Sequence, residues 1–412
     1  MIDTNKPSDS SPPLCSHKAS SMTKINYPLA TSSWDHEELE AMQEVIASGM
    51  FTMGTKVAEF ERQFAQYVGA KYCVMVNSGS SANLLMIAAM RYRKSNSLQP
   101  GDEIIVPAVS WSTTYYPLYQ YGLHLRFVDI DRDTLNYDLD QLADAVTDKT
   151  KAIMAVNLLG NPNDFDVISR IIGNRNIVLL EDNCESMGAE FGMRQAGTHG
   201  LMGTFSAFFS HHISTMEGGM VVTDDQELLH IMLAVRAHGW TRNLPKENLV
   251  CGIKSDDPFV ESFRFVLPGY NLRPLELSGA IGIEQLKKLP AMLVVRRSNA
   301  ARFADVISRH AWLRLQREVG SSSWFGFGLI LDKDAPLSRS QLVHRLTAAG
   351  IESRPIVAGN FAKNEVLRWF DYSIHGELAN ANDVDLNGLF IGNHHYDLQG
   401  ELPALDAVLS AI

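Results

Sequence analysis

The stretch YCVMVNSGSSANLLMIAAMR, residues 72–91, joins a short apolar run, a polar turn and a helical pattern in immediate succession. The run Tyr72–Val76 has the length and composition of a buried strand, and Ala82–Arg91 has the spacing of a helix. A strand that passes through a tight turn into a helix is typical of a parallel or mixed sheet covered by helices. This stretch therefore predicts an α/β domain.

Further short apolar runs follow, most of them separated by polar or helical segments, and His36–Ser48 upstream has helical spacing. The runs lie at Glu103–Val106, Leu125–Val128, Ala152–Val156, Ile177–Leu180, Phe205–Phe209 and Met220–Val222. Strands of this kind, apolar on both faces, indicate a sheet with helices on both sides that extends to about residue 250.

The sequence pattern changes after this region. Residues 246–275 are irregular and polar, and Leu275–Leu289 reads as a helix that leads into a second, basic one. Beyond about residue 310 a smaller α/β unit is predicted, with a strand at Trp324–Leu331 and a helix at Ser338–Ala349 that stops at Gly350.

These patterns predict three parts. Residues 1–21 are rich in Ser, Pro and Asp and are expected to form a disordered tail, without the apolar segment of a secretory signal. Residues 22–275 form a large α/β domain, and residues 276–412 form a connecting helix and a small C-terminal α/β domain.

Composition excludes several classes of protein. With 36 basic and 47 acidic residues among 412, the net charge is 36 − 47 = −11, which disfavours nucleic acid and anionic membranes as partners. No apolar run reaches the ~18 residues of a membrane span. The four cysteines lie far apart without a CxxC pair, which excludes a zinc ribbon and disfavours a disulfide framework. We expect a cytoplasmic protein.

The turn Asn77–Ser81 is a candidate anion site. Backbone N–H groups at the start of a helix attract an anion, and serine hydroxyls add donors. A serine that only caps the helix explains the same residues equally well.

Three further candidates follow two predicted strand ends. Asp182 and Glu185 come directly after Ile177–Leu180, where an Asp pairs with a protonated ring nitrogen of a cofactor or simply caps a helix. Trp111 follows the run at 103–106 and either stacks on a planar ring or lies in the core.

The segment SAFFSHHISTMEGG, residues 206–219, contains two adjacent histidines, His211 and His212. Histidine is suited to proton transfer near neutral pH, and a packed structural role explains one of the two equally well. Metal binding is disfavoured, because neighbours in an extended segment point to opposite faces.

Together, several segments resemble one family. They are GSS at 79–81, LLEDNCES at 179–186, SAFFSHHISTMEGG at 206–219 and PGYNLRPLELSGAIGIEQL at 268–286. From about Lys24 to its C-terminus, the chain resembles the nucleotide-sugar aminotransferases, which use pyridoxal 5'-phosphate (PLP) and have fold type I. The resemblance implies a large mixed-sheet α/β/α domain plus a smaller C-terminal α/β domain.

One position departs from most of that family. A lysine that binds the cofactor covalently usually stands six residues before the Glu of Glu-Gly-Gly, and here that position is His211. A histidine there resembles the 3-dehydratase branch. Lysine is absent from Ala152 through Pro245, so no substitute lies nearby in the sequence. The cofactor would therefore be held non-covalently, as PLP or as the amine, pyridoxamine 5'-phosphate (PMP).

Other segments resemble members that act on GDP sugars in the colitose pathway. They are VPAVSWSTTYYPLYQYGL at 106–123, AVNLLGNPNDFD at 155–166, RAHGWTRNLP at 236–245 and SRPIVAGNF at 353–361. Members that act on CDP sugars also carry a cysteine set for an iron–sulfur cluster, which this sequence lacks. The resemblance implies a GDP-sugar substrate, L-glutamate as amino donor, and a homodimer whose site is completed by the neighbouring subunit.

The resemblance also implies residue roles. Gly79, Ser80 and Ser206 hold the cofactor phosphate, with Asn271 from the neighbouring subunit. Trp111 stacks on the ring, Asp182 binds the ring nitrogen, Glu185 is a polar neighbour of the ring, and His211 is the acid/base.

For the sugar or its diphosphate, His238, Arg242 and Arg354 are candidates, and a loop or surface role explains each equally well. A nucleotide-sugar 4-aminotransferase and a non-catalytic PLP-fold protein stay as alternative functions.

Overall fold

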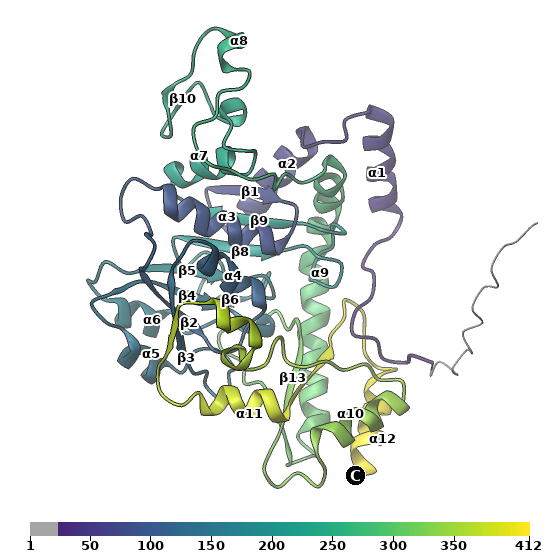
Figure 1. Cartoon of the computed structure of the whole chain (residues 1–412). Helices are drawn as coiled ribbons and strands as arrows, with labels where there is room; N and C mark the ends of the chain where they lie inside the picture. Colours follow the sequence, from purple (N-terminus) through teal and green to yellow (C-terminus); the bar gives the residue numbers. More distant parts are fainter. Residues whose placement is uncertain (1–23) are drawn as a thin grey trace, which may run out of the picture.

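The computed structural model describes residues 24–412, so the predicted tail at 1–21 lies outside them. Figure 1 shows a large sheet with helices on both sides and a smaller unit beyond one end of it, linked by the long helix α9 (Glu276–Ile307). No helix within residues 24–412 combines the length and apolar character that crossing a membrane requires.

The large sheet has eight strands in the order β1-β9-β8-β5-β4-β2-β3-β14. Within it, β9 is antiparallel to both of its neighbours and the other pairs are parallel. The strands are β1 (Tyr72–Val76), β2 (Glu103–Pro107), β3 (His124–Val128), β4 (Thr150–Val156), β5 (Val178–Asp182), β8 (Met202–Ser206), β9 (Gly219–Thr223) and β14 (Tyr372–Ile374). The mixed sheet predicted from the sequence is thus confirmed.

Both faces of this sheet are buried, as the apolar runs predicted. In β2, Ile104 and Val106 pack in one cluster and Ile105 packs in another, because successive side chains of a strand point to opposite faces. Helices that pack on the first face are α3 (Gly79–Tyr92), α4 (Ser112–Gln120) and α7 (Gln226–Val235). Those on the second are α2 (Thr55–Val68), α5 (Leu139–Ala145), α6 (Phe165–Ile172) and the first half of α9.

Helix α9 differs from the prediction of two successive helices. It runs unbroken through Pro290, which is exposed. An internal proline costs about 3 kcal/mol. Both halves of the helix bury apolar residues, the first against the large sheet and the second in the small domain, and this packing outweighs the cost.

The small domain has a three-stranded antiparallel sheet, β12 (Leu313–Leu315), β13 (Gly326–Leu331) and β15 (Gly388–Gly392). Its helices are α10 (Arg339–Ala348), α11 (Ala379–Asn387) and α12 (Leu402–Ser410). The predicted helix is confirmed: Ser338 caps α10 and the chain turns at Gly350 with positive φ. The predicted strand at 324–331 begins two residues late, since Trp324 has a φ of 46°.

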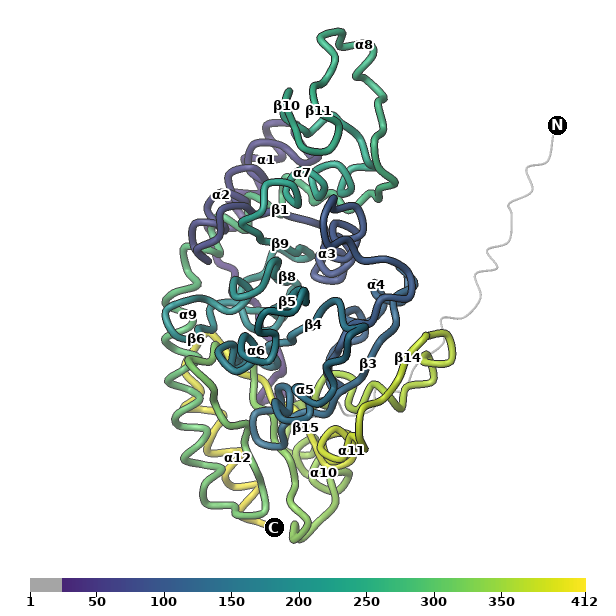
Figure 2. The backbone as a smooth tube through the Cα atoms, turned by 90° about the vertical axis from the view of Figure 1, so that its left-hand side faces the viewer, coloured from purple at the N-terminus to yellow at the C-terminus, as the bar shows by residue number. Residues whose placement is uncertain are grey.

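Two strand assignments differ from the sequence prediction. The run Phe205–Phe209 leaves the sheet after Ser206, and Phe208 and Phe209 are exposed. From the C-terminal region, β14 pairs parallel to β3 and forms an edge of the large sheet, as Figure 2 shows. The domain boundary at residue 275 stays a prediction.

Residues 246–266 form a projecting arm, visible at the top of Figures 1 and 2. It contains the hairpin of β10 (Glu247–Asn248) and β11 (Gly252–Ile253) and the short helix α8 (Pro258–Glu261). The remaining elements are α1 (His36–Ser48), β6 (Glu190–Phe191), β7 (Arg194–Gln195), η1 (Leu158–Gly160), η2 (Thr241–Asn243), η3 (Phe361–Lys363) and η4 (Glu365–Trp369).

The small-domain core gives a stability test. Phe303 of α9 is fully buried, and its ring stacks on Phe327 with centroids 3.8 Å apart. We expect Phe303→Ala to lower the free energy of unfolding by about 3–5 kcal/mol in chemical denaturation, because it leaves a cavity. Val294→Ala, on the exposed side of the same helix, serves as the control and should change it by less than about 0.5 kcal/mol. Equal effects would contradict the packing described.

Candidate active site

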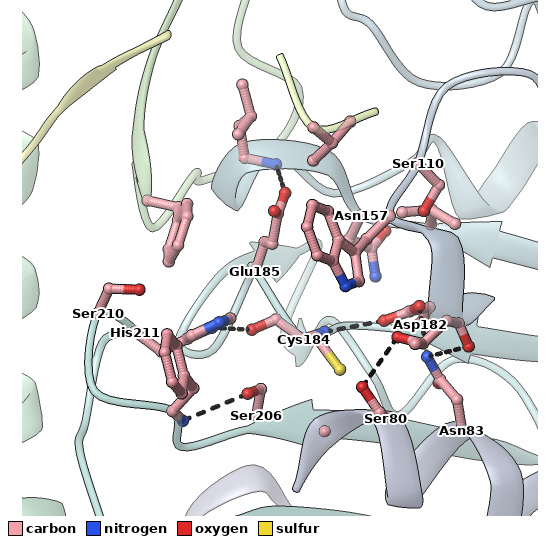
Figure 3. A pocket seen from close by; sticks show the side chains of 18 of the residues that line it. Ser80, Asn83, Ser110, Asn157, Asp182, Cys184, Glu185, Ser206, Ser210 and His211 are labelled. Carbon is pink, nitrogen blue, oxygen red and sulfur yellow. Dashed lines mark hydrogen bonds between the residues drawn. The ribbon is translucent and has the colours of Figure 1, made fainter. Parts of the chain in front are cut away.

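A cavity of about 540 Å³ opens at the carboxyl edge of the large sheet. Strands β1, β2, β4, β5 and β8 all end there, which is the edge where open α/β sheets bind ligands. The small domain closes the opposite side, chiefly through Phe325, Arg354 and Phe390. Figure 3 shows the wall formed by the large domain. Of the sequence-predicted residues, the cavity brings together Gly79, Ser80, Trp111, Asp182, Glu185, Ser206, His211 and Arg354.

The first turn of α3 forms one end of the cavity. The Ser78 hydroxyl accepts from the Ser81 N–H at 3.1 Å and caps the helix, so the serine cap weighed in the sequence analysis is present. The Ser80 hydroxyl donates to Thr113 at 3.1 Å. A Cβ added to Gly79 would lie 2.7 Å from the Cβ of Ser206, so only glycine allows β8 to approach the helix start. The helix start and the hydroxyls of Ser80 and Ser206 thus line the end of the cavity where an anion would be stabilised.

Asp182 ends β5 with its carboxylate held in place. Its Oδ2 accepts from Asn83 Nδ2 at 2.8 Å and from Thr114 Oγ1 at 2.7 Å, and its Oδ1 accepts from the Cys184 N–H at 3.2 Å. The side chain is buried yet lines the cavity. A fixed buried carboxylate of this kind can bind a cationic N–H of a ligand.

Trp111 lies directly before α4 and lines the cavity, and its side chain is 57% exposed. A tryptophan that lines a cavity with so much free surface is not a core residue, so the core alternative is wrong. Its open face is available to a planar ring.

Glu185 lies on the same wall as Asp182. Its Oε2 accepts from the Leu159 N–H at 3.1 Å, and Leu159 adopts a φ of 55° that few leucines adopt. Burial, with a smaller contribution from Asp182, raises the pKa of Glu185 to about 7, while the Leu159 bond opposes the rise. Glu185 can therefore hold a proton near neutral pH.

His211 faces the cavity with its ring fixed. Its Nδ1 lies 2.8 Å from the Cys184 carbonyl oxygen, and its ring centroid lies 4.9 Å from that of Phe325. Because a carbonyl only accepts, Nδ1 carries the hydrogen. Burial is the main cause that lowers the pKa of His211 to about 4, and the charge of Arg296 lowers it further. The ring is therefore neutral at pH 7 and Nε2 keeps a free lone pair.

His212 takes the structural role that the sequence left open for one of the two histidines. It is buried away from the cavity, with Nε2 3.2 Å from the Ser323 carbonyl oxygen. Within residues 24–412, no group of three or more His, Cys, Asp or Glu side chains is arranged to hold a metal ion.

Three predicted residues lie outside the chain's own cavity. Asn271 and His238 are exposed near the base of the arm, where Arg273 contacts both of them. Arg242 is also exposed and stacks on Trp240, with its Cζ 5.1 Å from the ring centroid.

Several residues of the site were not predicted from the sequence. Asn83 and Thr114 orient Asp182, and Asn157, Phe325 and Phe390 line the cavity. A signal existed for Asn83, which is a polar residue four positions after Gly79 on a helix face that is otherwise apolar. No local signal marks Phe325 and Phe390, because only the domain arrangement brings them to the cavity.

Comparison with known proteins identifies the family of this chain. A model of the DegT/DnrJ/EryC1/StrS aminotransferase family matches residues 32–401. The match covers most of the chain, and the chain belongs to this family.

Particular relatives are much closer than the family as a whole. A GDP-4-keto-6-deoxy-D-mannose 3-dehydratase from Escherichia coli O55:H7 is 64% identical over 386 residues, covering 93% of this chain and 100% of that protein. A solved E. coli structure of this dehydratase with bound hydrated PLP has a TM-score of 0.93 at 63% identity, covering 94% of this chain and 100% of that one. A second structure, with a trapped PLP-glutamate geminal diamine, has a TM-score of 0.92 at 63% identity, covering 93% and 100%.

The close approach at Gly79 gives a binding test. We expect Gly79→Ala to weaken PLP affinity at least about tenfold, because the methyl group displaces Ser206 and narrows the anion-binding end. Gly400→Ala is the matched control, since a Cβ there meets nothing within 4 Å. Titration of PLP by absorbance measures both. Unchanged affinity in Gly79→Ala would contradict the assignment of this end.

Proposed function

We propose that the protein is a PLP/PMP-dependent lyase, a dehydratase that removes the C3 hydroxyl of GDP-4-keto-6-deoxy-D-mannose. The product is GDP-4-keto-3,6-dideoxymannose, an intermediate of colitose biosynthesis. The observation that carries the proposal is the neutral, fixed His211 in a cavity that no lysine lines among residues 24–412. The high identity to dehydratases over nearly the whole chain supports it.

The residues present fit the cofactor. The start of α3 with Gly79, Ser80 and Ser206 suits its phosphate, and Trp111 offers an open aromatic face to its ring. The fixed carboxylate of Asp182 suits the ring nitrogen and would keep it protonated. When bound, the cofactor supplies an electron sink and carries the amino group. With a histidine at position 211, this chain would hold it without a covalent bond.

His211 would move the proton. Its free Nε2 lone pair accepts a proton at neutral pH, and the Nδ1–H bond to the Cys184 carbonyl keeps the ring oriented as it does so. After accepting a proton, the same nitrogen can protonate the departing C3 hydroxyl. Glu185 lies on the neighbouring part of the wall as a second group able to exchange a proton near pH 7.

Glutamate would be the amino donor. The balanced reaction converts the sugar nucleotide and glutamate into the 3-deoxy sugar nucleotide, 2-oxoglutarate and ammonia. The C3–O bond is reduced to C–H, and glutamate is oxidised. An aminotransferase would instead keep the nitrogen in the sugar.

The experiment incubates the protein with PLP, glutamate and GDP-4-keto-6-deoxy-D-mannose. Mass spectrometry should show a sugar nucleotide lighter by one oxygen, and enzymatic assays should find one ammonia and one 2-oxoglutarate per sugar. A stable 4-amino sugar without free ammonia would reject dehydration in favour of aminotransfer. A protein that binds PLP but consumes neither compound would instead be non-catalytic.

We also infer a homodimer with shared sites, in the cytoplasm. Asn271 and His238 are exposed outside their own cavity, next to the segment where Trp240 bridges Phe265 of the arm of residues 246–266. The arm carries exposed apolar residues, among them Phe259 at 88% and Phe263 at 75% exposure, and such a patch marks an interaction surface. A second copy of the chain would cover it and receive Asn271 at its cofactor phosphate.

Mixed dimers test this sharing. We expect His211→Asn and Asn271→Asp to be nearly inactive alone, and their co-expression to restore about a quarter of wild-type activity. Random pairing makes half the dimers mixed, and each mixed dimer has one site with both native residues. A mixture no more active than its two components would contradict a shared site.

A further inference from the structure

The turn of residues 322–325, directly before β13, has its main chain held by a side chain of α9. Arg296 Nη1 donates to the carbonyl oxygens of Trp324 at 3.4 Å and Phe325 at 3.2 Å, and to that of Asn393 at 3.0 Å. Trp324 has a φ of 46°, a conformation that persists in such a residue only where its surroundings hold it. One guanidinium nitrogen therefore fixes two successive peptide groups of this turn.

Phe325 contacts both adjacent histidines from this fixed main chain. Its ring centroid lies 4.9 Å from that of His211 and 5.6 Å from that of His212. Its N–H donates to the Leu159 carbonyl oxygen at 3.1 Å, so both peptide groups of Phe325 are hydrogen-bonded. The His211 ring makes one hydrogen bond within residues 24–412, from Nδ1, and the packing of Phe325 on the ring therefore helps to set its tilt.

Arg296 also brings a positive charge close to His211. Its side chain is 5% exposed, and no carboxylate within residues 24–412 forms a salt bridge with it. Burial lowers the pKa of Arg296 to about 10, so the guanidinium stays charged at pH 7. Arg296 and His211 both line a polar cavity of about 10 Å³, with room for roughly one water, and no Asp or Glu among the described residues lines it. The charge of Arg296 is therefore not neutralised on this side.

Resting on the proposed function, we infer that Arg296 is a positioning residue for the base His211. It holds Phe325 against the imidazole ring and keeps a positive charge near that ring, although it does not line the main cavity itself. A tilt of the imidazole would move Nε2 away from the atom it deprotonates, and a misplacement of about 1 Å costs up to about 100-fold in rate. Arg297, the next residue of α9, is a matched control, since it donates to the carbonyl oxygens of Ser322 and Gly188 instead.

The glutamate half-reaction tests the positioning role. Its rate is followed from the absorbance of the PLP-loaded full-length protein after mixing with glutamate. We expect Arg296→Met to lower the maximal rate about 10- to 100-fold, with less than about a threefold change in the half-saturating glutamate concentration, because the cavity walls that bind glutamate remain. Arg296→Lys keeps the charge but loses the planar set of donors and should lower the rate about three- to tenfold. Arg297→Met should stay within about twofold of the wild type.

The pH dependence of the same maximal rate tests the charge. Beyond burial and the Cys184 hydrogen bond, the charge of Asp182 raises the pKa of His211 and that of Arg296 lowers it. Without Arg296 the pKa of His211 rises, so the acid limb of the rate should move to higher pH by about half a unit or more in Arg296→Met. It should stay in place in Arg296→Lys and Arg297→Met. The other titratable or charged groups that line the two cavities beside His211 are Asp182, Cys184, Glu185, His212, Glu217, Arg354, His394 and His395.

Spectra of ¹⁵N-labelled histidine in the PLP-free full-length protein give a readout that needs no activity. The His211 signals, assigned by their loss in His211→Asn, should show a protonated Nδ1 and an unprotonated Nε2 at pH 7 in the wild type and in Arg297→Met. Arg296→Met should show a mixture of the two tautomers, because the ring is held less firmly.

PLP affinity and circular dichroism of each variant report on folding, and if Arg296→Met does not fold, the rate and spectrum of Arg296→Lys decide. A wild-type rate and spectrum in the Arg296 variant, or equal losses in Arg297→Met, would overturn the inference. A wild type that does not react with glutamate would instead reject the proposed function, and the histidine spectra alone would then decide whether Arg296 positions His211.

Discussion

The hydrogen bond between His211 Nδ1 and the Cys184 carbonyl oxygen, 2.8 Å long, is the interaction on which the site depends. It fixes the tautomer, since the carbonyl can only accept, and it fixes the direction of the ring. Burial then keeps the ring neutral by lowering the pKa of His211 to about 4. A base with a free Nε2 at pH 7 results. A lysine in this place would bind the cofactor covalently, whereas on the proposed function this histidine would leave the carbonyl end of the cofactor free.

The fold supplies the partners of this bond from one edge of the sheet. Cys184 follows β5 two residues after Asp182, and His211 follows β8, which pairs parallel to β5. The same edge carries Ser206 and the start of α3, where Gly79 permits close approach. The parallel β5–β8 pairing therefore fixes His211 and Asp182, the proposed base and ring-nitrogen partner, relative to each other. The antiparallel pairings β8–β9 and β9–β1 place the start of α3, the proposed anion-binding end, beside them. The register of the large sheet thus determines the relative positions of the residues that line the cavity.

Sequence patterns predicted much of this arrangement. Buried strands are recognisable from apolar runs, and the turn after β1 from its serines and glycine, because these signals are local. The single helix α9 was not predicted, since packing of both halves overrides Pro290. The pairing of β14 with β3 was not predicted either, because it joins residues about 250 positions apart in the chain. Within the site, roles for Asp182 and His211 followed from a family resemblance, while the cavity walls at Phe325 and Phe390 required the structure.

The central claim is that His211 Nε2 is the proton carrier, and release of tritium from C2 of [2-³H]glutamate tests it directly. The PLP-loaded wild type, without sugar nucleotide, should release tritium from glutamate in proportion to the cofactor converted, counted as tritium in water plus tritium transferred to the cofactor. His211→Asn should bind PLP with similar affinity, because Asp182, Trp111 and the start of α3 remain, yet release tritium at least about 100-fold more slowly. Release at the wild-type rate from His211→Asn would contradict the account, since another group would then be moving the proton.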